Sequence, residues 1–387
     1  MSLEELDKKL VSASENGQTI SPILAEGVKN YLIDIDGTIC DDIPNEEPER
    51  MLTAEVYPDA LITLNKWYDE GHVICFFTSR TEEHRDYTET RYSEEELMNI
   101  TEKIIDSLTK DFDDFIFSES VKSMKIDYKL KNNKGLDLRY QDEYFEMGLI
   151  VKAKSSPNLF DTFVGFQGRD LDLEKFLAAS KKQLTAERKK VELPKEEKVP
   201  VFFTSPDSLG QFLLRQLNGE LYGNKASLFD NKLGEQLFNK KFTLVLNNDP
   251  KTSYSPFFDV EGVTIENDTL PLIENGVLKR VFTDKKNAAK FNLEHTGSAS
   301  GGYDDIPSLT FTNVRVTTDT KDMHKVLNGK KAILVLVAAG GDFNADGHYA
   351  TPVQASYLFD GNSILGKLPE FNMNNGLYSM LGKDYIG

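Results

Sequence analysis

The N-terminal part of the sequence has a strand–helix–strand pattern that restricts its fold to a parallel α/β unit. Residues 30–36 are mostly apolar and predict a buried strand, and residues 72–78 predict a second one. Between them, residues 58–70 predict a helix that begins at Pro58 and ends before Gly71. Two strands joined by one helix within so short a stretch are expected to run in parallel as a βαβ unit.

The first predicted strand ends in two carboxylates, Asp34 and Asp36, which are followed at once by Gly37 and Thr38. Alternation along a strand places both side chains on the same side, where the strand ends. Two carboxylates held this close repel each other unless a cation lies between them, so the pair predicts a Mg²⁺ site. The alternative is that they cap a turn in a unit without activity.

The pattern changes after about residue 91. Ser93 and Glu96 form a capping box that predicts a long amphipathic helix. Alternating apolar residues on both sides of a turn at 132–135 then predict an antiparallel hairpin. Further strands are expected at 144–153 and 161–167, and a helix at 171–187.

A proline- and charge-rich segment at 189–200 predicts a linker, and mostly β structure is expected beyond it. The strongest β segments there are 242–247, 271–273, 277–283, 308–316 and 332–338, with a strand at 201–204 and a helix at 207–218 before them. Asn275-Gly276 predicts a hairpin turn. The predicted fold class is therefore α+β. The predicted organisation is an α/β fragment at 1–91, a central α+β region at 92–188, the linker, and a β-rich domain at 201–387.

Charge and cysteine content limit the functions that the chain can have. The net charge is −18, with 63 acidic and 45 basic residues among 387, which disfavours nucleic acids and anionic membranes as partners. Cys40 and Cys75 are the only cysteines, so no disulfide framework is expected and a reducing compartment is favoured. No apolar run approaches the roughly 20 residues that span a bilayer. The first 17 residues are too polar for a signal peptide, so a cytoplasmic location is expected.

Asp34-Ile35-Asp36-Gly37-Thr38 resembles motif I of the haloacid dehalogenase (HAD) superfamily, and Thr78-Ser79-Arg80 resembles its motif II. The resemblance implies that Asp34 is a phosphoryl-accepting nucleophile, Asp36 a general acid/base and Thr78 a phosphate contact, with Mg²⁺ at Asp34 and Asp36. A carboxylate can attack phosphorus when a metal neutralises the approach. The match covers only about residues 29–90, and the later strands of that family are not recognisable, so this unit is expected to be incomplete.

Residues from about 92 to 387 resemble the TldD/PmbA family, most closely its PmbA (TldE) branch. The matching blocks occur in the family's order and spacing, at 230–238, 257–263, 272–278 and 291–297. The resemblance implies a subunit of a bacterial, oligomeric peptidase complex that acts on peptides. Its partner would be a metal-bearing TldD-like subunit, or a second copy of the chain in a dimer.

In that family the TldD branch binds its metal through His-Glu-x-x-x-His on a helix, and the PmbA branch lacks this motif. The equivalent helix here, at about 207–219, contains no histidine, although such zinc chemistry needs two on one helical face. No zinc site and no cofactor are therefore expected in this part. The five histidines are expected to be structural, with His72 at a strand edge, His84 on a helix surface, and His295, His324 and His348 in separate segments.

Three hypotheses follow from these patterns. The first is a metal-free PmbA-like subunit of a peptidase complex. The second is a Mg²⁺-dependent phosphatase acting through Asp34, with the C-terminal part as an accessory domain. The third is a fusion of two truncated units, natural or constructed, because the two patterns abut near residues 88–92 without a linker signal.

Overall fold

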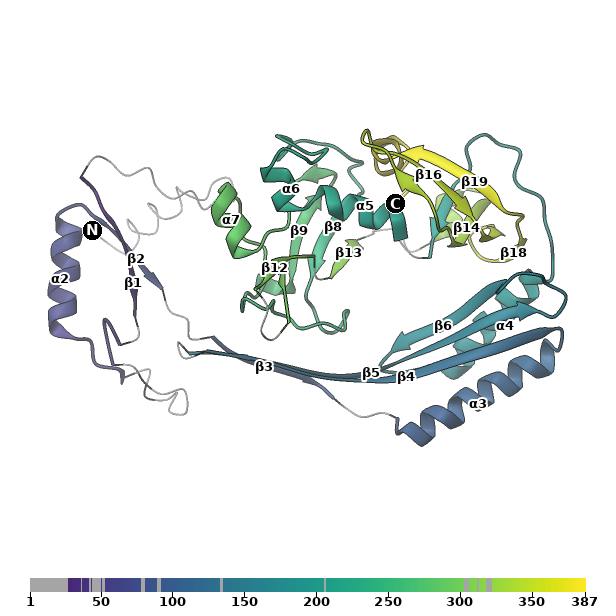
Figure 1. Cartoon of the computed structure of the whole chain (residues 1–387), viewed down its shortest axis with the longest axis horizontal. Coiled ribbons are helices and arrows are strands. Elements are labelled where there is room, and N and C mark those ends of the chain that lie inside the picture. The colour runs from purple at the N-terminus through teal and green to yellow at the C-terminus, as the bar shows by residue number, and fades with distance from the viewer. Residues whose placement is uncertain are drawn as a thin grey trace. The chain divides into compact units, whose positions relative to one another are not determined.

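The structure is a computed structural model, and it describes residues 27–35, 37–41, 43, 50, 53–77, 81–88, 92–132, 135–204, 207–302, 306–311, 313–317 and 322–387. The chain divides into two compact units. Figure 1 labels their helices and strands. The first comprises Met1–His84 with Lys129–Arg139, and the second comprises Arg85–Tyr128 with Tyr140–Gly387. Each unit is described by itself below.

The first unit contains the predicted βαβ arrangement. Strands β1 (Asn30–Asp34) and β2 (Val73–Phe77) pair in parallel, and helix α2 (Pro58–Asp69) connects them. The ring of Tyr31 on β1 stacks on Trp67 of α2 with 4.1 Å between centroids, which fixes the helix against the strands. This part of the sequence prediction is confirmed.

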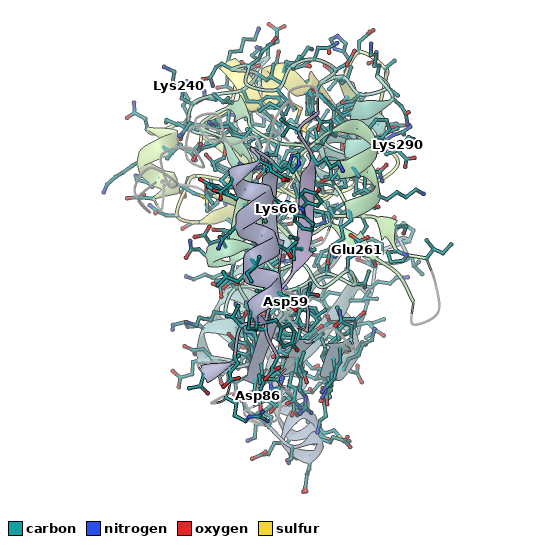
Figure 2. All side chains as sticks on the ribbon, turned by 90° about the vertical axis from the view of Figure 1, so that its left-hand side faces the viewer. Asp59, Lys66, Asp86, Lys240, Glu261 and Lys290 are labelled. Carbon is teal, nitrogen blue, oxygen red and sulfur yellow. The ribbon has the colours of Figure 1, made fainter. Side chains whose placement is uncertain are left out.

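Helix α2 shows why its sequence specifies a helix. Pro58 occupies the first turn, where its missing N–H costs nothing. Asp59 lies in the first turn and Lys66 in the last, so both charges complement the helix dipole (Figure 2). Leu64 is the buried residue of the helix, and Lys66 forms an i,i+4 pair with Glu70.

The predicted hairpin consists of two strands much longer than expected. β4 (Phe115–Lys131) and β5 (Leu136–Ala153) form a sheet with β3 (Thr81–Tyr87) in the order β3-β5-β4, and β6 (Thr162–Gly168) also pairs with β5. The two separate strands predicted at 136–140 and 144–153 are therefore one. The prediction of His84 on a helix surface is wrong, because the residue lies in β3.

Two helices of the second unit cover one face of this sheet. Helix α3 (Glu94–Asp111) begins at the predicted capping box, and α4 (Leu173–Glu187) begins at Asp172, whose side chain accepts the Lys175 N–H. Their apolar side chains pack on those of β5 and β6 in one cluster, which includes Ile104, Leu108, Leu149, Val151, Val164 and Leu184. The 3.6-residue periodicity of α3 therefore faces the sheet, as the sequence predicts.

The rest of the second unit is mostly β structure. Its elements are β7 (Val201–Phe203), α5 (Asp207–Gln216), α6 (Gly219–Gly223), β8 (Thr243–Asn247), η2 (Glu266–Asp268), β9 (Thr269–Glu274), β10 (Val277–Leu278), α7 (Lys285–Phe291), β11 (Ala299–Ser300), β12 (Ser308–Leu309), β13 (Val314–Thr317), α8 (Met323–Leu327), β14 (Ala332–Val337), β15 (Asp342–Phe343), β16 (His348–Val353), β17 (Ala355–Phe359), β18 (Ile364–Lys367), β19 (Phe371–Gly376) and η3 (Ser379–Lys383). Together with the elements above they make a mixed fold of the predicted α+β class.

These strands form small sheets of orders β10-β9-β8-β13, β18-β17-β14-β7, β15-β16-β19 and β11-β12. The strand predicted at 308–316 is therefore two short strands in different sheets. The strand predicted at 277–283 extends only over Val277–Leu278. No helix among the described residues is long and apolar enough to cross a membrane.

Candidate functional site

The structure describes only part of the predicted Mg²⁺ site. Asp34 is the last residue of β1 and stands opposite Phe77, the last residue of β2. Asp36 and Thr78 lie outside the described residues, and only the backbone of Asp34 is described. The strands pair in parallel, so their described last residues, Asp34 and Phe77, lie at the same edge of the two-stranded sheet.

Helix α5 (Asp207–Gln216) covers most of segment 207–219, which the sequence analysis matched to the metal-binding helix of the TldD branch. Leu213, Leu214 and Leu217 are buried in the largest core cluster of the second unit. Gln216 is also buried, and its side-chain oxygen accepts the Leu228 N–H at 2.8 Å. The inner side of this helix is therefore filled by leucines and one satisfied amide, and its charged Arg215 is exposed.

The histidines of the second unit have separate environments. His295 Nδ1 accepts the Gly297 N–H at 3.3 Å, and its Nε2 lies 3.7 Å from a carboxylate oxygen of Glu261. His324 Nδ1 lies 3.2 Å from the carbonyl oxygen of Asp360. Within the described ranges, no three His, Cys, Asp or Glu side chains are grouped so that they could hold a metal ion.

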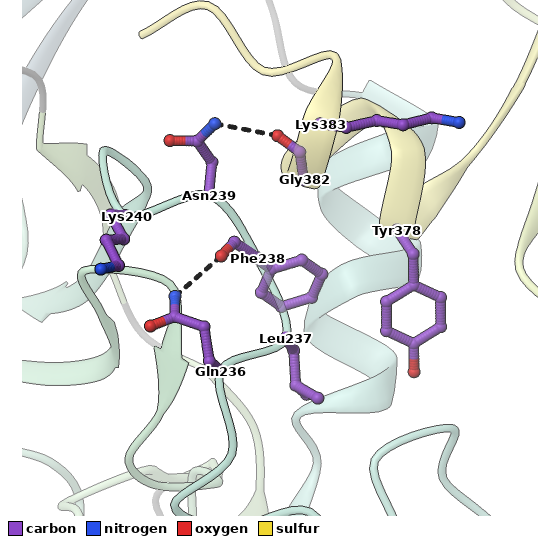
Figure 3. Close-up of a pocket in the computed structure, with 8 residues that line it drawn as sticks. All are labelled: Gln236, Leu237, Phe238, Asn239, Lys240, Tyr378, Gly382 and Lys383. Atoms are coloured by element: carbon purple, nitrogen blue, oxygen red, sulfur yellow. Dashed lines mark hydrogen bonds between the residues drawn. The ribbon is translucent and has the colours of Figure 1, made fainter.

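The second unit has an open hollow of about 590 Å³ between two segments that are far apart in the sequence (Figure 3). One wall is the loop 236–240, and the other is the C-terminal helix η3 with the residue before it. The lining residues are Gln236, Leu237, Phe238, Asn239, Lys240, Tyr378, Gly382 and Lys383.

The loop wall is held in place by a hairpin turn. The Leu237 and Phe238 N–H groups both donate to the carbonyl oxygen of Gly276 at 3.0 Å. The Gln236 amide donates to the carbonyl oxygens of Phe238 and Asn275, each at 2.8 Å. Because the predicted Asn275-Gly276 turn receives these bonds, its conformation sets the shape of the hollow.

The helical wall is a π-helix. The Asp384 N–H donates to the carbonyl oxygen of Ser379, five residues earlier, at 2.9 Å. Asn239 joins the two walls, since its backbone N–H donates to Leu381 O at 2.8 Å and its side-chain amide to Gly382 O at 3.0 Å (Figure 3). π-Helical turns are rare in proteins, and those that occur are often found at functional sites.

The residues that line the hollow include an aromatic pair and two lysines. The rings of Phe238 and Tyr378 stack with centroids 5.9 Å apart, and the Tyr378 hydroxyl accepts a hydrogen bond from Lys232 at 3.1 Å. Lys240 and Lys383 are exposed and are the charged residues of the lining. The lining includes no carboxylate, imidazole, thiol or serine hydroxyl, so its chemistry suits binding and offers no nucleophile–base pair.

Sequence reasoning did not identify this hollow. The block at 230–238 contributed to the family resemblance, but no pattern linked it to residues 378–383, which lie about 140 positions further along the chain. Such a pairing carries no periodicity and no local turn signal, so only the tertiary structure reveals it.

Comparison with known protein families finds a match for the C-terminal half of the chain. Residues 196–385 match the family described as "PmbA/TldA metallopeptidase C-terminal domain". The match includes α5, the hairpin at Gly276 and both walls of the hollow. This part of the chain is accordingly similar to the C-terminal domain of that family.

Two individual proteins are similar in sequence to this chain. An uncharacterized protein of Methanocaldococcus jannaschii is 26% identical over 251 residues, covering 61% of this chain and 56% of that protein. A protein of Saccharolobus solfataricus named as a zinc metalloprotease TldD homolog is 23% identical over 241 residues, covering 59% and 53%. The chain thus spans about half the length of these curated relatives.

Solved structures share the fold. TldE from Thermococcus kodakarensis superposes with a TM-score of 0.62 at 20% identity, covering 79% of this chain and 73% of that one. A putative modulator of a DNA gyrase from Thermotoga maritima superposes with a TM-score of 0.65 at 22% identity and the same coverage. At these identities the likeness is one of fold.

Proposed function

We propose that the chain is a TldE-like subunit, without a metal of its own, of a peptidase complex whose other subunit is a metal-bearing TldD-like protein. The family match over residues 196–385 and the TldE fold support the assignment to this type. The observation that carries the metal-free role is helix α5. A reducing, cytoplasmic location belongs to the same proposal and rests on the two cysteines.

The physical reason lies in what a zinc site requires. Catalytic zinc takes three protein ligands and leaves one position open for water, and helical motifs supply two histidines from one face. On α5 the inner positions are the buried Leu213 and Leu214, and none of the described residues of the helix is a histidine. Its one carboxylic acid, Asp207, is the first residue of the helix. Peptide hydrolysis is therefore assigned to the partner, and this chain supplies binding surface.

Co-purification tests the proposal directly. The tagged chain is expressed alone and together with the TldD-like protein of the same organism, and each preparation is assayed for zinc and for cleavage of unfolded peptides. The co-expressed pair should elute together, contain zinc in the partner and cleave peptide in a chelator-sensitive way. The chain expressed alone should contain no zinc and should not cleave the peptides. Stoichiometric zinc and chelator-sensitive cleavage in the chain expressed alone would refute the metal-free role. A stable dimer of the chain that does not bind the TldD-like protein would contradict the proposed assembly.

A phosphatase is the second candidate, because the parallel register of β1 and β2 places Asp34 and Phe77, the last residues of the two strands, at one sheet edge. Turnover of phosphate esters with Mg²⁺, abolished by Asp34→Asn, would support it. The matched control is Asp59→Asn on the exposed surface of α2, which should leave any turnover unchanged. A broad panel of esters without turnover rejects this candidate.

A further inference from the structure

We propose that the open face of the central sheet is a docking surface for a second copy of this chain, related to the first by a two-fold axis. Figure 1 shows the strands β4, β5 and β6 of this sheet side by side. The open face is the side of these strands that points away from α3 and α4, between residues 146 and 152 of β5 and between 163 and 167 of β6. The proposal is independent of the proposed function, because association of two identical chains needs no peptidase partner.

Alternation along the strands separates the covered face from the open face. Leu149 and Val164 are partners in the register of β5 and β6, and both are buried in the cluster that α3 and α4 cover. The next pair in the register, Ile150 and Phe163, therefore points to the opposite side. Ile150 is 53% exposed and Phe163 41%, so the described part of the chain leaves this apolar pair uncovered. Neighbouring exposed apolar side chains of this kind are typical of an interaction surface.

A strip without side chains lies beside the apolar pair. Two residues further along the strands, Gly148 pairs with Gly165, and both are exposed. A Cβ added at Gly148 would meet nothing within 4 Å, so the space above this part of β5 is open. The open face therefore has a ridge, formed by Ile150 and Phe163, next to a recess above Gly148 and Gly165. Ridge and recess are about 7 Å apart along the strands.

A two-fold axis makes this relief complementary to itself. The axis lies between the two copies, perpendicular to the strands and level with Leu149, so that the strands of the second copy run in the opposite direction. Position 150 of one copy then faces position 148 of the other, and position 163 faces position 165. Each ridge enters the recess of the other copy, as an interface between two identical surfaces requires. Face-to-face sheets lie about 10 Å apart, and side chains of both inner faces fill the space between them.

The charges at the two ends of the open face obey the same axis. By alternation, Glu146 and Lys152 lie on this face, on either side of Leu149. The axis places Lys152 of each copy against Glu146 of the other, which gives two pairs of opposite charge. Glu146 is held in position by the Gln167 amide, which donates to it at 2.9 Å. The net charge of −18 opposes self-association, but at 0.15 M salt it is screened beyond about 8 Å, so the charges inside the interface decide.

The size of the open face predicts a weak, reversible dimer. Residues 146–152 and the adjacent parts of two neighbouring strands cover on the order of 350 Å² in projection. Ile116 of β4 adds to the apolar area, because its neighbours Phe115 and Phe117 pack on the covered side. The connection from β5 to β6 adds the exposed Leu159 and Phe160. Stable interfaces bury about 800 Å² per partner, so this dimer is expected at the low end of specific interfaces.

Sedimentation velocity of the chain alone, at 0.15 M salt and from about 1 to about 200 µM, tests the proposal. The unaltered chain should change from monomer to dimer over this range. Phe163→Glu should weaken the dimer at least about tenfold, because it places a charge against an apolar recess. The matched control is Met98→Glu, at an exposed apolar position of α3 on the other side of the sheet, and it should associate like the unaltered chain. A chain that stays monomeric throughout, or equal weakening in both variants, overturns the proposal.

Exchange of ridge and recess tests the axis itself. Gly148→Leu adds an apolar side chain to the open face without a clash in its own chain. Nonspecific association would then become stronger, whereas the proposed axis predicts association weaker by at least about fivefold, because the recess for Ile150 is filled. The double variant Gly148→Leu with Ile150→Ala moves the ridge to position 148 and should restore the dimer. Stronger association of the single variant, or a double variant that is folded by circular dichroism but stays monomeric, refutes the axis.

Exchange of charge gives an independent test of the same axis. Lys152→Glu and Glu146→Lys should each weaken the dimer, because each places two like-charge pairs in the interface. The double variant has the unaltered net charge and pairs of opposite charge again, so it should recover. If Glu146→Lys strengthens association while Lys152→Glu weakens it, the effect is that of net charge and the proposed pairs are wrong.

The two proposals fail separately. A chain that binds the TldD-like protein but stays monomeric when alone contradicts only the docking of a second copy. If Phe163→Glu then abolishes binding of the TldD-like protein, the open face belongs to that partner and the second copy is excluded. A chain that forms the two-fold dimer but never binds the TldD-like protein contradicts only the proposed function.

Discussion

Arg169 and Asp142 form a buried bidentate ion pair, with Nε 2.8 Å from Oδ1 and Nη2 2.6 Å from Oδ2. Asp142 is fully buried and also accepts the Tyr140 hydroxyl at 2.5 Å. Burial, together with the hydrogen bond to this carboxylate, raises the pKa of Tyr140 above its usual range. Arg169 in addition donates to the carbonyl oxygens of Pro250 and Ser253, so one guanidinium connects the central sheet with the loop after β8.

Arg169→Lys should destabilise the protein by about 1–3 kcal/mol, because an ammonium group keeps the charge but cannot make the two parallel bonds and leaves part of a buried carboxylate unsatisfied. The free energy of unfolding in urea measures this effect. Arg188→Lys is the matched control, since Arg188 pairs with Asp114 on the surface and both side chains are at least 40% exposed. It should cost about 1 kcal/mol or less. Equal losses in the two variants would show that burial of the Arg169 pair is unimportant.

Asp259 gives the protein a specific dependence on pH. Burial raises the pKa of its carboxyl group, although the N–H groups of Val263, Ala299 and Glu261 donate to it and oppose the shift. A raised folded-state pKa means that ionisation costs more in the folded than in the unfolded protein. The contribution of Asp259 to stability should therefore fall as the pH rises from the unfolded value of about 3.9 through the raised folded value.

The difference in the free energy of unfolding between the unaltered protein and Asp259→Asn isolates this contribution. The other carboxyl groups titrate in both proteins, so their effects cancel in the difference. The free energy of unfolding, measured from pH 3.5 to 7, should show the advantage of the unaltered protein over the variant shrinking as the pH rises. A constant difference, or one that grows with pH, would refute the raised pKa.

Gly276→Ala should destabilise the protein by at least about 2 kcal/mol and disturb the hollow. Gly276 has a φ of +78°, and an added Cβ would lie 2.3 Å from the carbonyl oxygen of Phe238, which belongs to the loop wall. Gly234→Ala is the control, because Gly234 has a similar φ of +85° with nothing within 4 Å of its Cβ position. It should cost about 1 kcal/mol. Urea unfolding of both variants separates backbone strain from the clash.

Ser93→Ala should cost about 1 kcal/mol, because the Ser93 side chain accepts the Glu96 N–H at the start of α3 and Glu96 bonds back to the Ser93 N–H at 2.7 Å. Ser118→Ala, at an exposed position of β4, should change the free energy of unfolding by less than about 0.5 kcal/mol. Equal effects at the two serines would mean that the capping box contributes nothing.

The elements predicted correctly from sequence are those whose signals are local. The start of α3 follows from Ser93 and Glu96, which interact within one turn. The hairpin at Asn275 and Gly276 follows from two residues that tolerate positive φ, which are +48° and +78° here. His84 was assigned wrongly because its surroundings in the sequence are polar, and its place in β3 depends on pairing with β5.

The sequence by itself determined the βαβ unit, the capped helices, the tight turns and the resemblance that the family match over residues 196–385 supports. These depend on neighbours a few positions apart or on ordered blocks along the chain. Only the tertiary structure brought Asn239 to Leu381 and Arg169 to Asp142. Contacts of that kind depend on how whole elements pack, because burial and hydrogen bonding act on groups that are close in space, whatever their separation in the chain.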